Sequence, residues 1–158
     1  MTFEIDSVEK MQVLAKAIGN ALVGGDVVAL IGDLGTGKTT LSKGIGQTLG
    51  VEGHMSSPSY TIVNMYNCRF GPLYHSDVYR IDDPSQLEDI GFFDYLHEKG
   101  ILLVEWADKI KEDLLQETEQ YIELHLTVSG EGRCVEISGY GGFEERFKGE
   151  VDHASFGL

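Results

Sequence analysis

The amino-acid sequence predicts an α/β fold built on one sheet that mixes parallel and antiparallel strands. Two runs of consecutive apolar residues, 27–31 and 101–104, indicate strands that are covered on both faces, as in parallel sheets. Residues 121–128 alternate between apolar and polar side chains, which is typical of a strand with one buried face. Apolar residues at helical spacing separate these strands. Strands and helices that follow one another along the chain predict an α/β domain.

The first half of the chain predicts a helix, a buried strand and a second helix. Ser7 is the predicted N-cap of the first helix, and Gly24-Gly25 ends it. The strand 27–31 and a glycine-rich turn follow. The apolar positions of the two helices are Met11, Leu14, Ala15, Ile18, Ala21 and Leu22 in the first, and Leu41, Ile45 and Leu49 in the second.

The second half predicts two hairpins with a buried strand and short helices between them. Period 2 in the predicted strand 73–80 places His75, Asp77 and Tyr79 on one face. The predicted elements are strands 60–67 and 73–80 around a turn, short helices within 84–98, a strand over 101–104, a helix over 107–116, and a hairpin of 121–128 with 133–138.

The chain of 158 residues is long enough for a single domain with its own core. We predict that residues 1–140 form this domain. Residues 141–158 are predicted to be a tail or a loosely docked helix, because Phe143 and Phe147 are their main core candidates. Cys68 and Cys134 share no CxxC spacing, and we expect both to be reduced thiols.

The charge balance is strongly acidic, with 12 Lys and Arg against 26 Asp and Glu and a net charge of −14. Nucleic-acid affinity comes largely from basic side chains that neutralise phosphates, so tight direct binding to RNA or DNA is not expected. No apolar run reaches the roughly 20 residues of a membrane helix, and the first residues are neither basic nor apolar. We therefore expect a cytoplasmic protein without a membrane partner.

One segment carries the chemistry of phosphate binding, because it matches the pattern GxxxxGK[ST]. Glycines let successive backbone N–H groups point at phosphates, and the N-terminus of the following helix adds attraction. The lysine reaches the β- and γ-phosphates, and the hydroxyl after it can ligate Mg²⁺. The predicted phosphate-binding residues are Gly32, Asp33, Leu34, Gly35, Thr36, Gly37, Lys38, Thr39 and Thr40.

The ligand predicted for this loop is ATP with Mg²⁺, and the fold is then a three-layer, P-loop NTPase-like fold. The guanine-reading pattern Asn-Lys-x-Asp is absent from the chain, which favours ATP over GTP. The adenine-contacting residues stay open. The segment 5–12 or the hairpin 121–138 could supply them.

Two carboxylates at predicted strand ends are candidates for the metal and the attacking water. Glu105 directly follows the buried run 101–104, and Asp77 lies on the polar face of its strand. Each could instead be an ordinary surface carboxylate, and the sequence leaves open which one contacts metal. Trp106, next to Glu105, packs either against the site or in the core.

The segment of Ser57, Pro58, Ser59 and Tyr60 is rich in hydroxyl groups and follows the phosphate-loop helix. Segments of this kind can sense the γ-phosphate as a switch. The alternative is a simple turn.

Four segments together resemble the TsaE (YjeE) family of small bacterial ATPases. They are GDLGTGKTT (32–40), SPSY (57–60), HSDVYR (75–80) and VEW (104–106). Ser59 stands where the family usually has Thr, which keeps the hydroxyl but removes a methyl group.

The resemblance implies a role in the threonylcarbamoyl modification of the adenosine beside the anticodon in tRNA. The partners would be TsaB-like and TsaD-like proteins, and tRNA would be met only indirectly. Lys38 would hold phosphates, Thr39 and Glu105 would lie on the Mg²⁺ side, and Asp77 would be a metal-side or water-side acid. Ser57 to Tyr60 would form the switch-like segment, with Trp106 beside the site.

Two other functions stay open at this stage. A small metabolite kinase generally needs lid arginines, and Arg69, Arg80, Arg133 and Arg146 are the only four arginines of the chain. None of the four lies in an evident lid. A nucleotide sensor that binds ATP without hydrolysing it is the other alternative.

Overall fold

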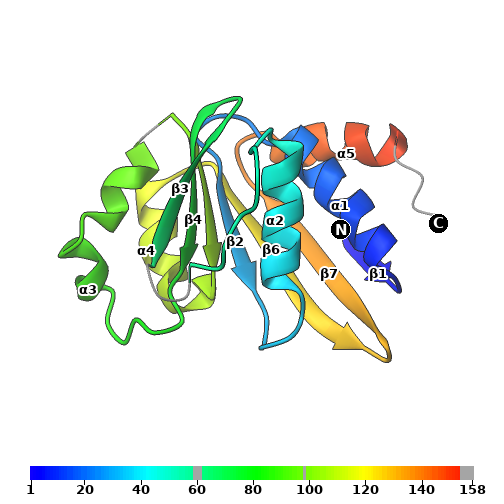
Figure 1. Cartoon of the computed structure of the whole chain (residues 1–158), viewed down its shortest axis with the longest axis horizontal. Coiled ribbons are helices and arrows are strands. Elements are labelled where there is room, and N and C mark those ends of the chain that lie inside the picture. The colour runs from blue at the N-terminus through cyan, green and yellow to red at the C-terminus, as the bar shows by residue number, and fades with distance from the viewer. Residues whose placement is uncertain (59–61, 98, 154–158) are drawn as a thin grey trace.

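The structure is a computed structural model that describes residues 1–58, 62–97 and 99–153 (Figure 1). None of the helices in these ranges is both long enough and apolar enough to cross a membrane. In chain order the elements are β1 (Thr2–Ile5), α1 (Val8–Ala21), β2 (Val27–Ile31), α2 (Lys38–Thr48), β3 (Val63–Cys68), β4 (Gly71–Asp77), α3 (Ser85–Glu88), the 3₁₀ helix η1 (Phe92–His97), β5 (Ile101–Glu105), the 3₁₀ helix η2 (Ala107–Ile110), α4 (Lys111–Glu117), β6 (Tyr121–Ser129), β7 (Gly132–Gly139) and α5 (Phe143–His153).

The strands form one seven-stranded sheet in the order β1-β7-β6-β2-β5-β4-β3. Its centre is parallel, because β2 pairs with both β5 and β6, and β4 pairs with β5, all in the parallel sense. Its two edges are antiparallel, through β3 on β4 and through β1 and β7 beside β6. The predicted mixed sheet is confirmed.

Helices cover both faces of this sheet, which gives three layers (Figure 1). One face packs against α1, α2 and α5, and the other packs against α3, the two 3₁₀ helices and α4. Val28 and Leu30 point to the first face, while Val27 and Ala29 point to the second. The apolar run of β2 is therefore explained by burial on both sides, and the predicted three-layer α/β fold is confirmed.

Local signals place α1 and α2 where the sequence predicts them. Ser7 is the N-cap of α1, and its hydroxyl accepts a 3.2 Å hydrogen bond from the Lys10 backbone N–H. In α2, Leu41 and Ile45 are fully buried, and Leu49 is fully buried at its C-cap. The helical spacing of these residues is what presents them to the sheet.

Three features differ from the expected elements. The four-residue strand β1 was not expected, although Phe3 and Ile5 alternate with polar residues and are buried. The predicted strand 73–80 ends at Asp77, so Tyr79 lies outside the sheet and is exposed. Val128 belongs to the apolar set of the alternating strand 121–128 but is exposed, because the β6–β7 hairpin extends past the helices that would cover it (Figure 1).

The C-terminal segment forms α5, and its two aromatic side chains belong to the core. Phe143 and Phe147 are both fully buried, with rings stacked at 5.4 Å between centroids. The ring of Phe3 meets Phe147 edge-on at 5.7 Å. Residues 143–153 therefore form a helix that packs at the β1 end of the sheet through these two side chains.

A buried carboxylate, Asp26, also ties α5 to the loop before β2. Its Oδ2 accepts hydrogen bonds from the Val23 backbone N–H at 2.8 Å and from Arg146 at 3.3 Å, and its Oδ1 accepts one from Gln120 at 2.9 Å. Arg146 also donates to the Ala21 carbonyl at 2.7 Å. Burial raises the pKa of Asp26, and these hydrogen bonds and the Arg146 charge oppose that rise.

Replacing Arg146 with alanine is expected to lower the free energy of unfolding by about 1–2 kcal/mol at pH 7. This is less than the 3–5 kcal/mol typical of a fully buried pair, because the guanidinium side chain is 32% exposed. The pKa of Asp26 in the folded protein is raised above its usual 3.8, so its carboxyl group is largely protonated near pH 4 and carries no charge for Arg146 to neutralise. The loss should therefore be smaller near pH 4.

Chemical denaturation at both pH values measures this effect. Lys148→Ala on the same helix is the control, because Lys148 is exposed. An equal loss at the two pH values would show that Arg146 acts through packing and its hydrogen bond to the Ala21 carbonyl, without a contribution from the charge of Asp26.

Candidate nucleotide-binding site

The candidate site lies where the three parallel strands β2, β5 and β4 end. Glu105 is the last residue of β5, and it pairs in register with Leu30 of β2 on one side and Asp77 of β4 on the other. The predicted phosphate-binding residues 32–40, called the phosphate loop from here on, follow β2 immediately. Ligands of open α/β sheets bind at this carboxyl edge, so the strand order brings the predicted loop and both predicted carboxylates together.

The loop can take its tight form because of two glycines. Gly37 adopts a left-handed backbone with φ of 103° at the N-cap of α2, a conformation that costs glycine little. A Cβ atom on Gly32 would lie 2.5 Å from the Leu126 carbonyl oxygen, so only glycine fits there. Between them, the Thr36 hydroxyl donates a 2.8 Å hydrogen bond to the Asp33 carbonyl and tightens the turn.

Lys38 begins α2 and is held inside the loop, with 5% of the residue exposed. Its ammonium donates to the Gly32 carbonyl at 2.5 Å and to the Asp33 carbonyl at 2.9 Å. Burial lowers the pKa of Lys38, and the charges of Glu105 and Asp77 act in the opposite direction. A phosphate group in the loop would add negative charge directly beside this buried cation.

Thr39, Glu105 and His75 form a chain of hydrogen bonds beneath the loop. The Thr39 hydroxyl donates to Glu105 Oε1 at 2.7 Å, and the other carboxylate oxygen, Oε2, lies 2.5 Å from His75 Nε2. Glu105 is 2% exposed and His75 is fully buried. Both oxygens of the strand-end carboxylate are thus engaged by neighbouring side chains.

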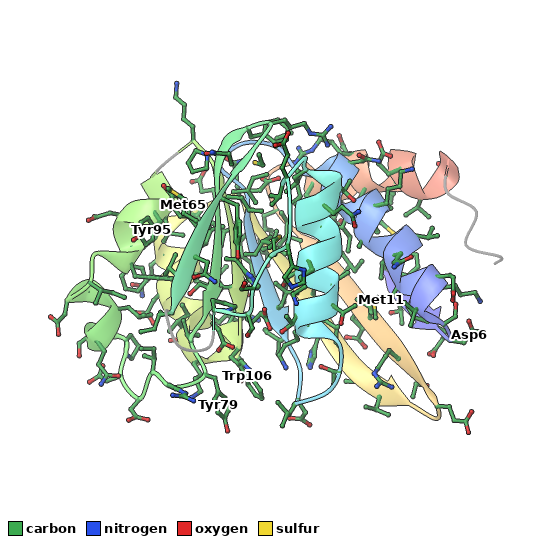
Figure 2. The ribbon with its side chains drawn as sticks, viewed as in Figure 1. Asp6, Met11, Met65, Tyr79, Tyr95 and Trp106 are labelled. Atoms are coloured by element: carbon green, nitrogen blue, oxygen red, sulfur yellow. The ribbon has the colours of Figure 1, made fainter. Side chains whose placement is uncertain are left out.

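Trp106 lies beside the loop in a backbone conformation that is rare for a bulky residue, with φ of 61° and ψ of 32°. Its ring lies 4.0 Å from Lys38 Nζ and 4.7 Å from the ring of Tyr79 (Figure 2). Lys109 in turn donates to the Tyr79 carbonyl and lies over its ring. The sharp turn after Glu105 therefore directs the indole toward the site.

A cavity of about 430 Å³ opens in front of these residues. Asp77 lines it, and its Oδ1 accepts a 2.9 Å hydrogen bond from the Tyr79 backbone N–H, which orients the carboxylate. At the tip of the loop, Leu34 is 87% exposed. The residues that line the cavity are Leu34, Gly35, Gly37, Lys38, Thr39, Thr40, Ser57, Asp77, Glu105 and Trp106.

The predicted switch-like segment reaches this cavity through Ser57, while Pro58 is buried. Its position is supported by β3, because the Ser56 backbone N–H donates to the Tyr66 hydroxyl at 3.0 Å and Asn64 donates to the Ser56 carbonyl at 3.3 Å. Ser59 and Tyr60, the other two residues predicted for this segment, lie outside the described residues.

The donor set fits a magnesium ion. Thr39 Oγ1 and Glu105 Oε1 are neighbouring oxygens joined by a hydrogen bond, and oxygens of this kind are the donors that could hold Mg²⁺. Within the described ranges, no group of three His, Cys, Asp or Glu side chains could enclose a metal. A site with few protein ligands is what Mg²⁺ prefers when phosphates and water complete its shell.

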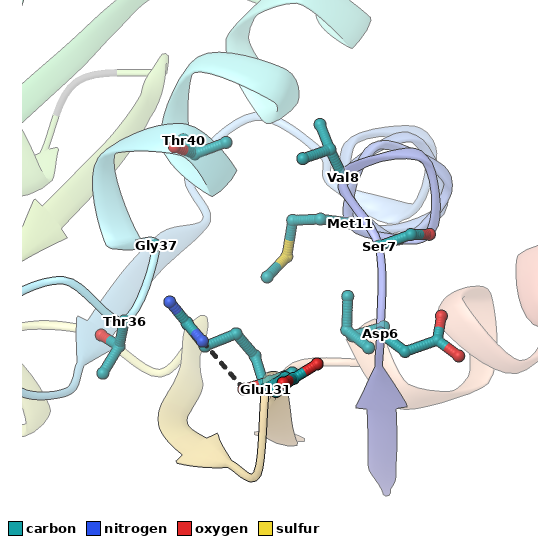
Figure 3. Close-up of a pocket in the computed structure, with 11 residues that line it drawn as sticks. Asp6, Ser7, Val8, Met11, Thr36, Gly37, Thr40 and Glu131 are labelled. Carbon is teal, nitrogen blue, oxygen red and sulfur yellow. Dashed lines mark hydrogen bonds between the residues drawn. The ribbon is translucent and has the colours of Figure 1, made fainter.

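A second cavity, of about 270 Å³, lies on the other side of the loop. Met11 points into it from α1, across from the β6–β7 hairpin (Figure 3). Gly37 and Thr40 line both cavities, so the two adjoin over the first turn of α2. The remaining lining residues are Ile5, Asp6, Ser7, Val8, Thr36, Glu131, Gly132 and Arg133.

Two residues with structural importance were not singled out by the sequence. Arg133 of β7 donates a 3.1 Å hydrogen bond to the Gly35 carbonyl, which ties the hairpin to the phosphate loop. His75 was placed on the face of Asp77 but given no role. Its place in the segment HSDVYR, two residues before the candidate acid, was the available signal. The structure brings the described candidate residues together, and their chemical roles remain predictions.

Comparison with known proteins identifies relatives over most of the chain. A family model described as threonylcarbamoyl adenosine biosynthesis protein TsaE matches residues 5–135. The tRNA threonylcarbamoyladenosine biosynthesis protein TsaE of Bacillus subtilis is 46% identical over 114 residues, which cover 72% of this chain and 71% of the relative. The protein of the same name from Borreliella burgdorferi is 32% identical over 140 residues, which are 88% of this chain and 100% of the relative.

A solved structure shares the fold. The crystal structure of YdiB from Bacillus subtilis matches with a TM-score of 0.77 and 29% sequence identity, over 97% of this chain and 95% of that one. The family match begins at the end of β1 and ends within β7, so it contains the phosphate loop, Asp77 and Glu105 but not α5.

Proposed function

Because the chain belongs to the TsaE family of threonylcarbamoyl adenosine biosynthesis proteins, we propose that it is a small ATPase that binds ATP with Mg²⁺. It acts as an accessory subunit for the threonylcarbamoyl modification of the adenosine next to the anticodon in tRNA, working on a TsaB–TsaD complex. The observation that carries the ATPase proposal is the convergence of Lys38, Thr39, Asp77 and Glu105 on one cavity.

The phosphate loop supplies the binding step. Its backbone N–H groups and the N-terminus of α2 attract the phosphates. Lys38 exchanges its hydrogen bonds to the Gly32 and Asp33 carbonyls for bonds to the β- and γ-phosphates. Desolvation of the lysine favours this exchange, because phosphate neutralises a charge that burial has destabilised.

The two carboxylates take different roles in this proposal. Thr39 and Glu105 hold the metal through adjacent oxygens, whereas Asp77 lines the open cavity and orients the attacking water. A Mg²⁺ ion held by Thr39 and Glu105 would supply positive charge that neutralises the phosphates. Trp106 lies over Lys38 and limits the space in which the lysine can move.

The adenine is assigned to the smaller cavity. Met11 provides an apolar surface for a base, and Gly37 and Thr40 connect this cavity to the phosphate site. Both the segment 5–12 and the hairpin 121–138 contribute to its lining, which supports a shared contact rather than a choice between them.

The acidic surface supports indirect contact with tRNA. A net charge of −14 opposes binding to a phosphate backbone, so protein partners are proposed to provide the contact with tRNA.

Cys68 and Cys134 are free thiols, which agrees with the cytoplasm as the place of action.

Mg²⁺-dependent ATP hydrolysis, measured with and without a purified TsaB–TsaD pair, tests this proposal. We expect slow turnover of the protein alone and faster turnover with the pair, because an ATPase that is activated by its partners needs contacts with them for full activity. ATP binding without turnover in either condition would favour a nucleotide sensor. Transfer of the γ-phosphoryl group to a metabolite rather than to water would favour a kinase.

A further inference from the structure

His75 is a buried histidine that contacts the proposed metal site without reaching the cavity. Its Nε2 lies 2.5 Å from Glu105 Oε2, whereas Glu105 Oε1 accepts a hydrogen bond from the Thr39 hydroxyl. The imidazole is fully buried and does not line the cavity in front of the loop. The hydrogen bond to Glu105 therefore connects His75 directly to the proposed metal site.

The fold places this histidine through strand register. In the parallel pair of β4 and β5, His75 pairs with Leu103 and Asp77 pairs with Glu105. His75 and Asp77 are two residues apart and share a face of β4. The strand β4 thus presents the Asp77 carboxylate to the cavity. Two residues earlier, it presents the His75 imidazole to the Glu105 carboxylate of β5.

The hydrogen bonding of the imidazole indicates which nitrogen carries the proton. Nδ1 is buried and has no hydrogen-bond partner among the described residues. A proton on Nδ1 would be a buried donor without an acceptor, which is rarer and costlier than an acceptor with an unused lone pair. The Nε2–H tautomer avoids this cost and donates to Glu105 Oε2.

We propose that His75 is a positioning residue for the magnesium site, with its Nε2–H holding Glu105 Oε2 so that Oε1 faces the Thr39 hydroxyl. The inference rests on the proposed ATP–Mg²⁺ function. A glutamate side chain has three rotatable bonds, and without this anchor the carboxylate can rotate away from Thr39. Groups that orient a metal ligand in this way typically change metal affinity about 10–100-fold when they are removed.

Two substitutions separate the hydrogen bond from the volume of the side chain. His75→Gln keeps an N–H donor that can reach the place of Nε2, while His75→Leu fills similar space without a donor. Ser76→Ala is the matched control, because Ser76 is the next residue of β4, is fully buried, and has a hydroxyl with no partner among the described residues. Thermal unfolding selects variants that are folded at the assay temperature.

The measurement is the dissociation constant of ATP by calorimetry, once with Mg²⁺ and once with EDTA. The ratio of the constant in EDTA to the constant with Mg²⁺ reports how much the metal strengthens nucleotide binding. We expect His75→Leu to reduce this ratio at least about tenfold, with little change in the constant measured in EDTA. His75→Gln and Ser76→Ala should stay within about threefold of the wild-type ratio.

A double-mutant comparison tests whether His75 acts through Glu105. In a Glu105→Gln background, His75→Leu is expected to cause no further loss in the ratio, because the negative charge that would bind the metal is already gone. A ¹H–¹⁵N spectrum of the histidine side chains adds a readout without ligand. It should show the Nε2–H tautomer for the resonance that disappears in His75→Gln.

The outcomes separate this inference from the proposed function. A wild-type protein that does not bind ATP with Mg²⁺ would overturn both. Normal wild-type binding with an unchanged ratio in folded His75→Leu, equal losses in the Leu and Gln variants, or an additive loss in the Glu105→Gln background would overturn the positioning role alone.

Discussion

Replacing Lys38 with alanine is expected to reduce ATP turnover by roughly 10²–10³-fold and to weaken ATP binding, as for the loss of one preorganised donor to the transition state. Lys38 is the cation that the phosphate loop holds inside the fold, with both of its carbonyl partners in the loop itself. Alanine removes the only positively charged side chain of residues 32–40, and with it the charge that can stabilise the γ-phosphoryl group as its own charge redistributes.

Initial rates of phosphate release and ATP titrations check this prediction. Lys43→Ala is the matched control, because Lys43 is on the same helix but lines a different surface hollow with Gln47 and His54. Thermal unfolding of both variants separates catalytic loss from unfolding. Hydrolysis by folded Lys38→Ala at the rate of Lys43→Ala would refute the assignment of the phosphate loop.

The second large effect is expected from Glu105→Gln, which should lower turnover about a hundredfold or more. Glutamine keeps the shape of the side chain but removes the negative charge that lies 2.7 Å from the Thr39 hydroxyl. The Mg²⁺ concentration for half-maximal rate should rise, because Mg²⁺ is held less tightly. ATP binding in EDTA should change little, since no metal is bound there.

Comparison with Asp77→Asn assigns the two carboxylates. Asp77 lines the cavity and its carboxylate is oriented by the Tyr79 backbone N–H, so its amide variant should lower the maximal rate while the Mg²⁺ concentration for half-maximal rate stays near that of the wild type. Titration of the hydrolysis rate with Mg²⁺ measures both values. The reverse pattern would assign the metal to Asp77 and the water to Glu105, and normal hydrolysis by either variant would remove that residue from the mechanism.

The parts of the site that sequence analysis found are those whose chemistry is local. The phosphate loop needs glycines, a lysine and a hydroxyl at fixed spacing, and the adjacent elements β2 and α2 follow from an apolar run and a helical repeat. Glu105 is marked by the buried strand just before it. In each case the residues that form the pattern and the element that they predict are close together in the chain, so the pattern can be recognised without knowing the fold.

The sequence was less informative where an element is short or is stabilised from a distance. The strand β1 has only four residues, too few for its alternation to stand out, and it exists because β7 pairs with it. The helix α5 has an average apolar content too low to mark it as core. Its two phenylalanines are buried because they join the core beside α1, where Phe147 meets Phe3 from the far end of the chain.

By itself, the sequence determined the fold class and singled out the candidate phosphate loop and the two candidate acids, because these depend on residue type and on spacing along one strand or helix. Only the tertiary structure decided that His75 lies against Glu105 and that the smaller cavity joins α1, the loop and the β6–β7 hairpin. Both depend on strand order and register. Burial and hydrogen bonding between residues far apart in the chain arise only after the sheet has assembled, and local periodicity does not encode which strands become neighbours.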